Sequence, residues 1–325
     1  MSRVRRIVVL TSATVLVLVL RPALGIAAPG TAARSEPTAS CNAACLDGFV
    51  DRFFAAALAH DPGRLETSND VRYTENGQLL PLGEGLWATL SGMRDYKLYI
   101  PDPIAGQVGY MGAVDENGAS SLIAARLKVA ERKVSEIEVI AARSDRADVP
   151  DYREVMAPPG FSSALSQSER VSRDRMIQIA NSYFDAIERQ SVSAELLADT
   201  CERVENGQTM AGNSRADDPL RRLSCREEIN AKALQYLSYV SPRRFIAVDE
   251  QHGTIFTLPM IVSTGAVPKT LKLADGTSFE PPDFARRPTT MLTAISFKIV
   301  SGRIEHIEAI QTAIPYGSKH GWEAN

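Results

Sequence analysis

The sequence predicts an α+β protein in which one unit, a helix followed by several strands, occurs twice. Three observations support this prediction. The string Glu-Asn-Gly-Gln stands at 75–78 and again at 205–208, an amphipathic helix precedes each copy, and two long strand-like segments end each half. The chain has 325 residues, of which 44% are hydrophobic and 23% are charged, and this length and composition fit a globular protein of two domains.

The N-terminus is expected to be an export signal. Three arginines precede an apolar run over 7–20, and small residues follow at 25–28. This arrangement is typical of a cleaved signal peptide, and the apolar run is short for a membrane span. We therefore predict a signal peptide at 1–28, a lead-in without fixed structure at 29–40, and a periplasmic or secreted protein without a stable membrane anchor. A retained anchor is the alternative.

The four cysteines are Cys41, Cys45, Cys201 and Cys225. In an oxidising compartment an even set predicts disulfides, and three pairings are possible. We favour Cys41–Cys45 with Cys201–Cys225, because each pair then stays within one half. No metal site is expected, since these spacings, with no histidine nearby, do not fit zinc.

Charge and missing motifs disfavour several classes of protein. The formal net charge is −3 and the arginine pairs are scattered, so we expect no nucleic-acid partner. The sequence has no Gly-rich phosphate loop, no His-Glu-x-x-His pair and no Gly-x-Ser-x-Gly elbow. Nucleotide-dependent enzymes, zinc proteases and α/β-hydrolases are therefore disfavoured.

The first half is expected to begin with a helix over 45–58, because apolar side chains recur there at steps of three and four residues. His60-Asp61-Pro62-Gly63 ends this helix. A Gly-rich connection at 83–92 holds Trp87. Turn-forming residues separate the strands that we predict at 71–76, 97–100, 107–114, 121–129 and 133–140.

The second half follows residues 144–171, which lack apolar periodicity and are interpreted as a linker. A second amphipathic helix is expected over 173–188. Residues 264–289 contain four prolines and are predicted to be an insertion. The remaining elements are predicted to be a strand at 202–206, a helix at 226–239, and strands at 245–248, 255–260, 291–300 and 303–313.

Three aligned segments indicate an internal duplication. The first helix and Glu-Asn-Gly-Gln align with their second copies at an offset of 130 residues, which places Glu75 on Glu205. Val114-Asp115-Glu116 aligns with Val248-Asp249-Glu250 at an offset of 134, and the final strands align at an offset of 170. The segments keep their order, and the growing offset fits the insertion.

Several features together carry a family resemblance: a helix with Phe49, Phe53 and Phe54, a strand that ends Glu75-Asn76-Gly77, and a long final hairpin in each half. In these features the chain resembles proteins of the nuclear transport factor 2-like fold, in the SnoaL-like branch. The resemblance covers residues 45–143 and 172–316. A Cys-led first helix and a Pro-Tyr-Gly…Gly-Trp tail further resemble exported tandem members, many without an assigned activity.

The resemblance implies a curved antiparallel sheet wrapped around helices, which forms a cone with an apolar pocket. The expected domains are SnoaL-like domain 1 at 41–143 and SnoaL-like domain 2 at 172–325. Because such sheets often pair with another copy, we expect the two halves to form an internal pseudo-dimer. The predicted state is a monomer with paired halves, with a dimer as the alternative.

Known SnoaL-like enzymes include isomerases, dehydratases, cyclases and cofactor-free lyases, and they need no bound metal. The resemblance therefore implies a cofactor-independent acid–base enzyme acting on a hydrophobic, aromatic or polycyclic small molecule. One fold hosts many functions, so a non-catalytic module that binds a small molecule or a protein is the alternative. An open pocket lined by Glu75 would favour the enzyme, and a pocket packed shut by Trp87 would favour the binding module.

Glu75 and Tyr73 are the candidate catalytic residues. Strand alternation places Val71, Tyr73 and Glu75 on one face. If that face lines the pocket, burial raises the pKa of the Glu75 carboxyl and makes it an acid–base group, with Tyr73 as its hydrogen-bond partner. The structural alternative is that Glu75 binds the backbone amides of the turn at Asn76-Gly77, which both halves repeat.

The second half has Arg203 and Glu205 where the first has Tyr73 and Glu75. Arg203 can hold Glu205 ionised, which favours the first half as the acid–base site, or it can bind an anionic group of a substrate. Trp87, Tyr96, Tyr99 and Asp102 are candidate ligand contacts in the first-half pocket, with core packing as the alternative.

His306 lies two residues before Glu308 on one predicted strand, so the two side chains can form an acid–base pair. A solvated strand face or a subunit contact is the alternative. His60 and His252 are expected to be exposed.

Overall fold

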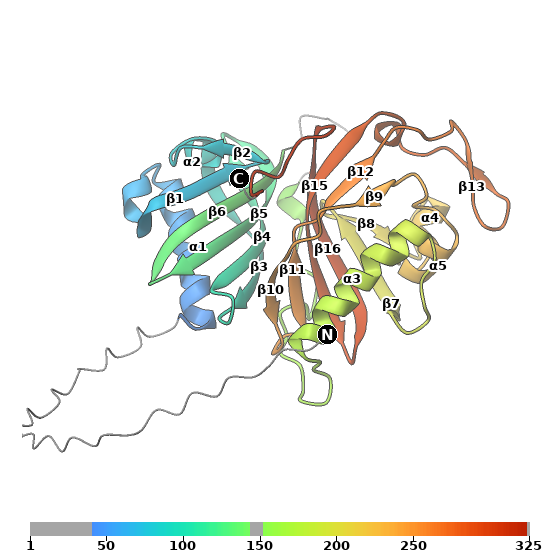
Figure 1. The fold of residues 1–325 in the computed structure, drawn as a ribbon, viewed down its shortest axis with the longest axis horizontal. Coiled ribbons are helices and arrows are strands. Elements are labelled where there is room, and N and C mark those ends of the chain that lie inside the picture. The colour runs from blue at the N-terminus through green and yellow to red at the C-terminus, as the bar shows by residue number, and fades with distance from the viewer. Residues whose placement is uncertain (1–40, 144–151, 324–325) are drawn as a thin grey trace, which may run out of the picture. The chain divides into compact units, whose positions relative to one another are not determined.

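The structure is a computed structural model that describes residues 41–143 and 152–323 (Figure 1). The described residues belong to one compact unit, Ala39–Asn325. They form a mixed α+β fold with curved sheets and few helices, which is compatible with a cone fold. The predicted signal peptide, the lead-in and residues 144–151 of the linker lie outside the described residues.

The first half forms one sheet and one long helix. Its elements are α1 (Ala43–Leu58), η1 (Pro62–Arg64), β1 (Thr67–Glu75), β2 (Gln78–Leu80), α2 (Leu86–Thr89), β3 (Leu90–Asp102), β4 (Gln107–Glu116), β5 (Ala119–Ala130) and β6 (Lys133–Arg143). The strand order is β2-β1-β6-β5-β4-β3, and β1 and β6 pair in parallel. Asn42 begins α1 by accepting the N–H of Cys45 with its side chain, as N-caps do. The strand predicted at 97–100 is longer, because β3 continues through two register shifts to Leu90.

The second half forms a larger sheet in the same strand order. Its elements are α3 (Arg173–Arg189), β7 (Leu197–Glu205), β8 (Gln208–Ala211), α4 (Pro219–Arg222), α5 (Cys225–Asn230), β9 (Tyr239–Val240), β10 (Phe245–Asp249), β11 (Thr254–Thr257), β12 (Met260–Ser263), β13 (Leu271–Lys272), β14 (Ser278–Phe279), η3 (Asp283–Arg286), β15 (Thr289–Val300) and β16 (Arg303–Pro315). The order β8-β7-β16-β15-β11-β10 repeats that of the first sheet, with β7 and β16 parallel.

Two predicted elements of the second half were too long. The helix predicted over 226–239 ends at Asn230, and Lys232 just beyond it has a left-handed backbone with φ 62°. The strand predicted over 255–260 is divided into β11 and β12 at Pro259, which has no N–H to donate. Within the predicted insertion, β13 and β14 pair as a short hairpin.

One of the three aligned segments joins strands that are not equivalent. Val114 lies on β4, the second strand from one edge of its sheet, whereas Val248 lies on β10, the edge strand of the other. In both halves Val-Asp-Glu stands where a strand ends and a turn begins. The match therefore reflects residues that turns favour and not equivalent strands. The other two segments agree with the sheet order, since Glu75 and Glu205 end β1 and β7.

The repeated Asn-Gly is a structural turn. Asn76 and Gly77 have φ 47° and 79° and join β1 to β2, as in two-residue hairpin turns. The Asn76 side chain donates to the carbonyl of Ala141 at 3.1 Å and accepts its N–H at 2.8 Å. Asn206 binds Gln311 in the same way, at 3.0 and 2.9 Å. Each asparagine side chain therefore makes the pair of hydrogen bonds that the next residue of β1 or β7 would make to the parallel strand beside it.

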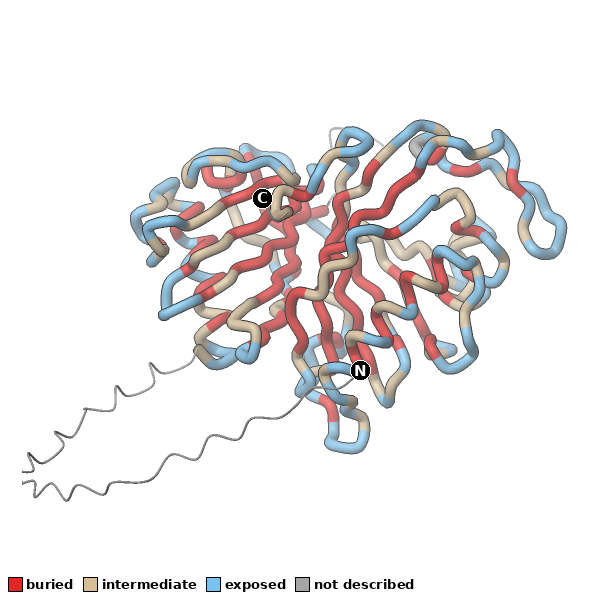
Figure 2. The backbone as a smooth tube through the Cα atoms, in the orientation of Figure 1, coloured by how far each residue is buried: buried red, intermediate tan, exposed pale blue. Residues whose placement is uncertain are grey.

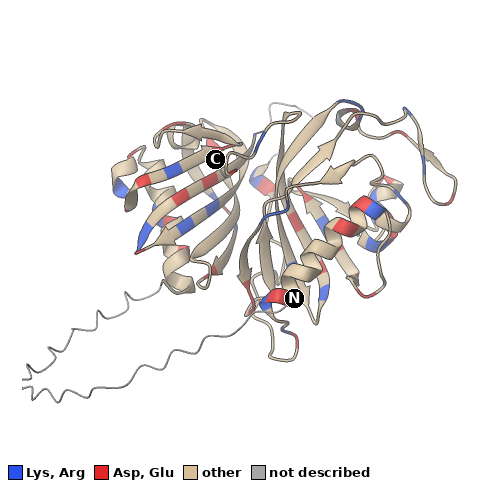
Figure 3. Ribbon diagram, viewed as in Figure 1, with Lys and Arg blue, Asp and Glu red and all other residues tan. Residues whose placement is uncertain are grey.

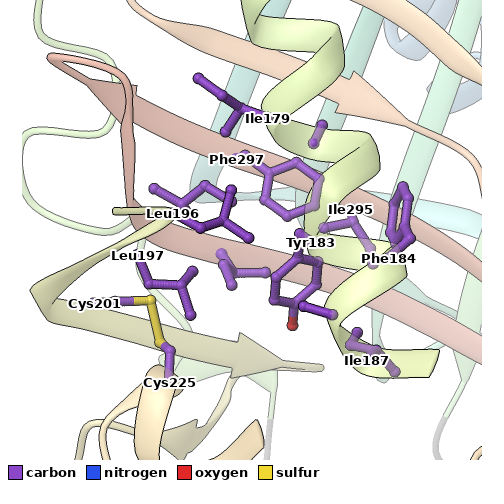
Figure 4. Close-up of a cluster of buried hydrophobic side chains, with 14 of the residues drawn as sticks. Ile179, Tyr183, Phe184, Ile187, Leu196, Leu197, Cys201, Cys225, Ile295 and Phe297 are labelled. Atoms are coloured by element: carbon purple, nitrogen blue, oxygen red, sulfur yellow. A yellow bond between two sulfur atoms is a disulfide. The ribbon is translucent and has the colours of Figure 1, made fainter. Parts of the chain in front are cut away.

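Three buried clusters hold the described residues together (Figure 2). In one, α1 covers the first sheet, and in another, α3 covers the second (Figure 4). The third, which we call the seam, contains side chains from the opposite faces of both sheets, including Leu98, Met111, Ile140, Phe256, Met260 and Leu292. Each sheet is therefore covered on one face by a long helix and, along the seam, on the other face by the opposite sheet.

Polar side chains bind across the seam. Tyr96 of β3 donates its hydroxyl to Glu308 of β16 at 2.9 Å. Arg244, just before β10, donates to both carboxylate oxygens of Glu138 on β6, at 2.7 Å each. Both carboxylates are buried, so each needs these donors to offset its lost hydration.

The C-terminal segment lies against the charged face of the first sheet, where β1, β5 and β6 present alternating acidic and basic residues (Figure 3). Trp322 donates its indole N–H to Thr74 at 2.8 Å. The guanidinium groups of Arg72 and Arg126 lie 4.7 and 4.5 Å from its ring. These cation–π contacts and the hydrogen bond attach the end of the second half to the first.

Both disulfides have the pairing that the sequence favours, Cys41–Cys45 and Cys201–Cys225. The second joins α5 to β7 beside the cluster under α3, as Figure 4 shows.

Replacing Asn76 with alanine should lower the free energy of unfolding by about 2–3 kcal/mol. Two hydrogen bonds of about 1 kcal/mol each are lost, and alanine is strained at this φ by about another 1 kcal/mol. Urea denaturation measures the change. Asn117→Ala is the matched control, because Asn117 has φ 48° in a similar turn with an exposed side chain. Equal losses in the two variants would contradict a structural role for the Asn76 amide.

Candidate functional site

Glu75 and Tyr73 lie in the packed interior of the first half. Their side chains share a face, as predicted, and the Tyr73 hydroxyl donates to Glu75 Oε2 at 2.7 Å. The N–H of Leu86 donates to the same oxygen at 2.7 Å, so α2 covers the carboxylate. Trp87 is fully buried and packs edge-on against Phe53, with ring centroids 5.3 Å apart. By the criterion stated above, this packing favours the binding module over an enzyme at Glu75.

The expected electrostatic difference between the halves is not present. Arg143 Nη1 lies 2.7 Å from Glu75 Oε1, and the same guanidinium binds Glu116 at 2.8 Å. Glu75 is therefore paired with an arginine, as Glu205 is. The sequence could predict that Arg203 pairs with Glu205, because the two residues lie on the same face of one strand. It could not predict that Arg143 pairs with Glu75, because Arg143 lies on a different strand, at the end of β6.

The other predicted contacts of a first-half pocket are in three different places. Tyr96 points into the seam, where it binds Glu308. Asp102 is fully buried and accepts the N–H of Val248 at 2.9 Å, and Arg173 lies 2.6 Å from it. Tyr99 donates to Asp51 at 2.8 Å. The sequence placed these side chains together in a first-half pocket, with core packing as the alternative, and it did not predict which neighbours they meet.

The second half contains a cavity between α3 and its sheet, which we call the second-half cavity. Its space for water-sized molecules is about 40 Å³, within a hollow of about 530 Å³ that includes open solvent at its mouth. Most of the lining is apolar, and Arg203, Glu205 and Gln311 supply its charged and amide groups. The apolar lining residues include Ile187, Leu234, Leu237, Ile261, Met291, Ile295 and Ile307.

Arg203 is buried in this wall between two carboxylates. It donates to Glu228 at 2.5 and 3.1 Å and to Glu205, whose second oxygen accepts Gln311 at 3.1 Å. Cys225 holds the start of α5 against β7 through its disulfide, and this places Glu228, one helical turn later, on Arg203. Burial raises the pKa of Glu228, and the Glu205 charge adds to this, while Arg203 opposes it.

The arrangement changes the role expected for Arg203. With two carboxylates already on its guanidinium, Arg203 has little remaining charge for an anionic ligand. Glu205 remains an acceptor at the cavity wall. The wall therefore suits a neutral ligand that donates a hydrogen bond, and a ligand larger than a few water molecules needs flexible side chains such as Met291 to move.

His306 and Glu308 form the expected pair, with Nε2 and Oε2 3.1 Å apart. Of the alternatives, a solvated strand face is wrong, because Glu308 is only 1% exposed and His306 packs edge-on against Phe161, while a contact between subunits stays untested. Burial raises the pKa of Glu308, while the hydrogen bond from His306 opposes this change. The pair contributes to the polar contacts of the seam.

Sequence reasoning missed Glu228 and Gln311, which bind the polar wall of the second-half cavity. The only sequence signal for Glu228 was its position after Cys225, if the favoured disulfide was assumed. Gln311 gave no signal, since it reaches Glu205 only through the pairing of β16 with β7.

Part of the chain is similar to known proteins. Residues 169–311, which hold the second-half cavity, match the family described as "Domain of unknown function (DUF8021)". No curated protein matches the chain. Among solved structures the chain is similar to "AclR a putative hydroxylase from Streptomyces galilaeus", at 15% identity and a TM-score of 0.28, over 34% of this chain and 91% of that one. No helix within 41–143 and 152–323 is long and apolar enough to cross a membrane.

Arg203→Met should destabilise the chain by about 3–5 kcal/mol, because it leaves two carboxylates at a buried site without their cation. The variant should lose more stability at pH 8 than at pH 5. Removing Arg203 raises the pKa of Glu228 further, and a carboxyl with a raised folded-state pKa loses its stabilising contribution as the pH rises through that pKa.

Urea denaturation at the two pH values tests this prediction. Arg143→Met is the matched control in the first half, and its cost should be smaller because the Arg143 side chain is 40% exposed. If both variants lost the same free energy of unfolding at both pH values, the Arg203 charges would not behave as buried charges, and the prediction would be wrong.

Proposed function

We propose that the chain binds a small, largely apolar molecule in the second-half cavity and that Glu205 accepts a hydrogen bond from its hydroxyl or amine. The supporting observation is an apolar hollow with one polar cluster, Arg203 with Glu205 and Glu228, in its wall. Small-molecule sites generally combine an apolar lining with a few fixed polar groups. The first half supports no such proposal at Glu75, because α2 covers that carboxylate.

The cofactor-independent lyase, dehydratase or isomerase expected from the sequence is the second candidate function. One observation favours it: Glu205 is a carboxylate at the wall of a cavity, with a guanidinium beside it. Such a carboxylate can remove a proton from a carbon next to a carbonyl. We therefore assign this candidate to Glu205 in place of Glu75.

For the architecture we propose two tandem SnoaL-like cone domains, at 41–143 and 172–325, that pair as an internal pseudo-dimer. The repeated strand order and the buried seam support this proposal. We also propose export, with cleavage of residues 1–28, because two disulfides are maintained best in an oxidising compartment.

The neutral amine N-phenyl-1-naphthylamine should bind the full chain and gain fluorescence in the second-half cavity. Ala309→Leu, which adds volume to the lining, should weaken binding about tenfold, and Glu205→Gln should weaken it less. Glu75→Gln is the matched control at the equivalent position and should bind as the unmodified chain does. Unchanged binding in Ala309→Leu would place the dye elsewhere.

The same proteins test the second candidate function. Phenolic dimers, epoxides and polycyclic ketones, incubated without metal or nucleotide, should be converted by the full chain and by Glu75→Gln but not by Glu205→Gln. Dye binding without conversion would leave the binding module as the function of this cavity.

The molar mass in solution tests the internal pairing. Since the two sheets already cover each other at the seam, we expect the chain to sediment as a monomer, near its 35.3 kDa. A tight dimer that Glu308→Gln weakens would contradict this expectation. It would show that the first half of one chain pairs with the second half of another.

A further inference from the structure

A second pocket lies where α1, β3 and the turn between β10 and β11 meet. We call it the seam pocket; it has a volume of about 230 Å³. Asp47 comes from α1, Tyr99 from β3, Phe161 from the segment before α3, and Asp249, His252 and Thr254 from the turn and its flanking strands. The approach of the three elements can be followed in Figure 1. No residue of the second-half cavity contributes to it.

His252 is oriented in this pocket by Asp249. The imidazole Nδ1 lies 2.6 Å from Asp249 Oδ2, and Asp249 Oδ1 accepts the N–H groups of Gln251 and His252 at 3.0 and 3.2 Å. Lys298 holds the same turn by donating to the carbonyl of His252 at 2.6 Å. A carboxylate on Nδ1 fixes the proton there, so Nε2 of the neutral ring is the acceptor.

Asp47 is the acidic partner on the other side of the pocket. Burial raises the pKa of Asp47 to about 6, the charges of Asp51 and Asp249 add to this, and His252 opposes it. Tyr99 also faces this group, but its hydroxyl donates to Asp51. Asp47 Oδ1 is buried and has no hydrogen-bond partner among the described residues. The carboxyl can therefore hold a proton in mildly acidic solution.

Thr254 gives independent evidence that the pocket takes a ligand. Its side chain lines the pocket and is 2% exposed, yet its hydroxyl has no partner among the described residues. A buried hydroxyl without a partner costs free energy, so such a group usually meets a ligand or an ordered water. Tyr99, Pro101 and Phe161 supply apolar walls next to it.

We propose that the seam pocket is a proton-transfer site for a small, uncharged carbonyl compound, with His252 as base, Asp47 as acid and the Thr254 hydroxyl on the carbonyl oxygen. The charges of Asp51 and Asp249 beside the pocket repel anions, which is why the ligand is expected to be neutral. The site is independent of the function proposed for the second-half cavity.

The proposed step is an isomerisation and needs no other reactant. The substrate is an α-hydroxy carbonyl compound. His252 Nε2 takes a proton from the hydroxyl-bearing carbon next to the carbonyl, and the electron pair of that C–H bond forms an enediol as the carbonyl oxygen gains the Asp47 proton. The protonated His252 then returns its proton to the former carbonyl carbon, and the other hydroxyl of the enediol gives its proton to Asp47, which forms the new carbonyl and restores both side chains. The product has the same atoms as the substrate. Positioned acid–base catalysis of this kind typically contributes about 10²–10⁴ in rate.

Hydrogen exchange measures the first step without knowledge of the substrate. The full chain is incubated in D₂O with hydroxyacetone, 3-hydroxybutanone and 2-hydroxycyclohexanone, and proton NMR follows deuterium entering next to each carbonyl. We expect at least one probe to exchange about 100-fold faster with the full chain than with Asp47→Asn or His252→Gln. Thr254→Val should mainly raise KM for that probe. Asp199→Asn, a change at an exposed aspartate, is the control.

The pH profile separates the proposed chemistry from a structural effect. The rate should fall as the pH rises above about 6, where Asp47 loses its proton. Asp51→Asn removes a neighbouring negative charge, lowers the pKa of Asp47 and should move this fall to lower pH. Equal exchange in the full chain and both site variants, or no exchange above the buffer rate with all three probes, would overturn the proposal.

Discussion

The structure depends on the burial of each sheet on two faces. A strand alternates its side chains, so one face of each sheet packs on a long helix and the other on the opposite sheet. Tyr96 with Glu308, and Arg244 with Glu138, supply the polar contacts that a buried face requires. Separating the sheets would expose the apolar seam and leave two buried carboxylates without these donors, so the halves stabilise each other.

The interiors of the two halves differ because different segments fill them. In the first half the short α2 follows β2 directly, and it places the N–H of Leu86 on Glu75 and the ring of Trp87 against α1. In the second half α5 is held to β7 by a disulfide, and Glu228 pairs with Arg203 at the side of the cone. The space between α3 and its sheet stays partly empty, and this space is the second-half cavity.

The seam pocket is a consequence of joining two halves in one chain. Asp47 belongs to the first half and His252 to the second, and the segment that connects them contributes Phe161 to the wall. The edge turn contributes Asp249 and His252, and α1 contributes Asp47. The like charges of Asp51 and Asp249, together with burial, bring the pKa of Asp47 to about 6. Either half alone would contain only part of this pocket.

The sequence alone determined the α+β class, most helices and strands, the repeated strand–turn motif and the disulfide pairing. These features depend on local periodicity, turn residues and chain proximity, which a sequence contains directly. It did not predict that Arg143 pairs with Glu75, that Tyr96 crosses the seam, or that His252 lines a pocket with Asp47. Those contacts join residues far apart in the chain. Only the tertiary structure decides them, because strand register and sheet packing determine which side chains meet.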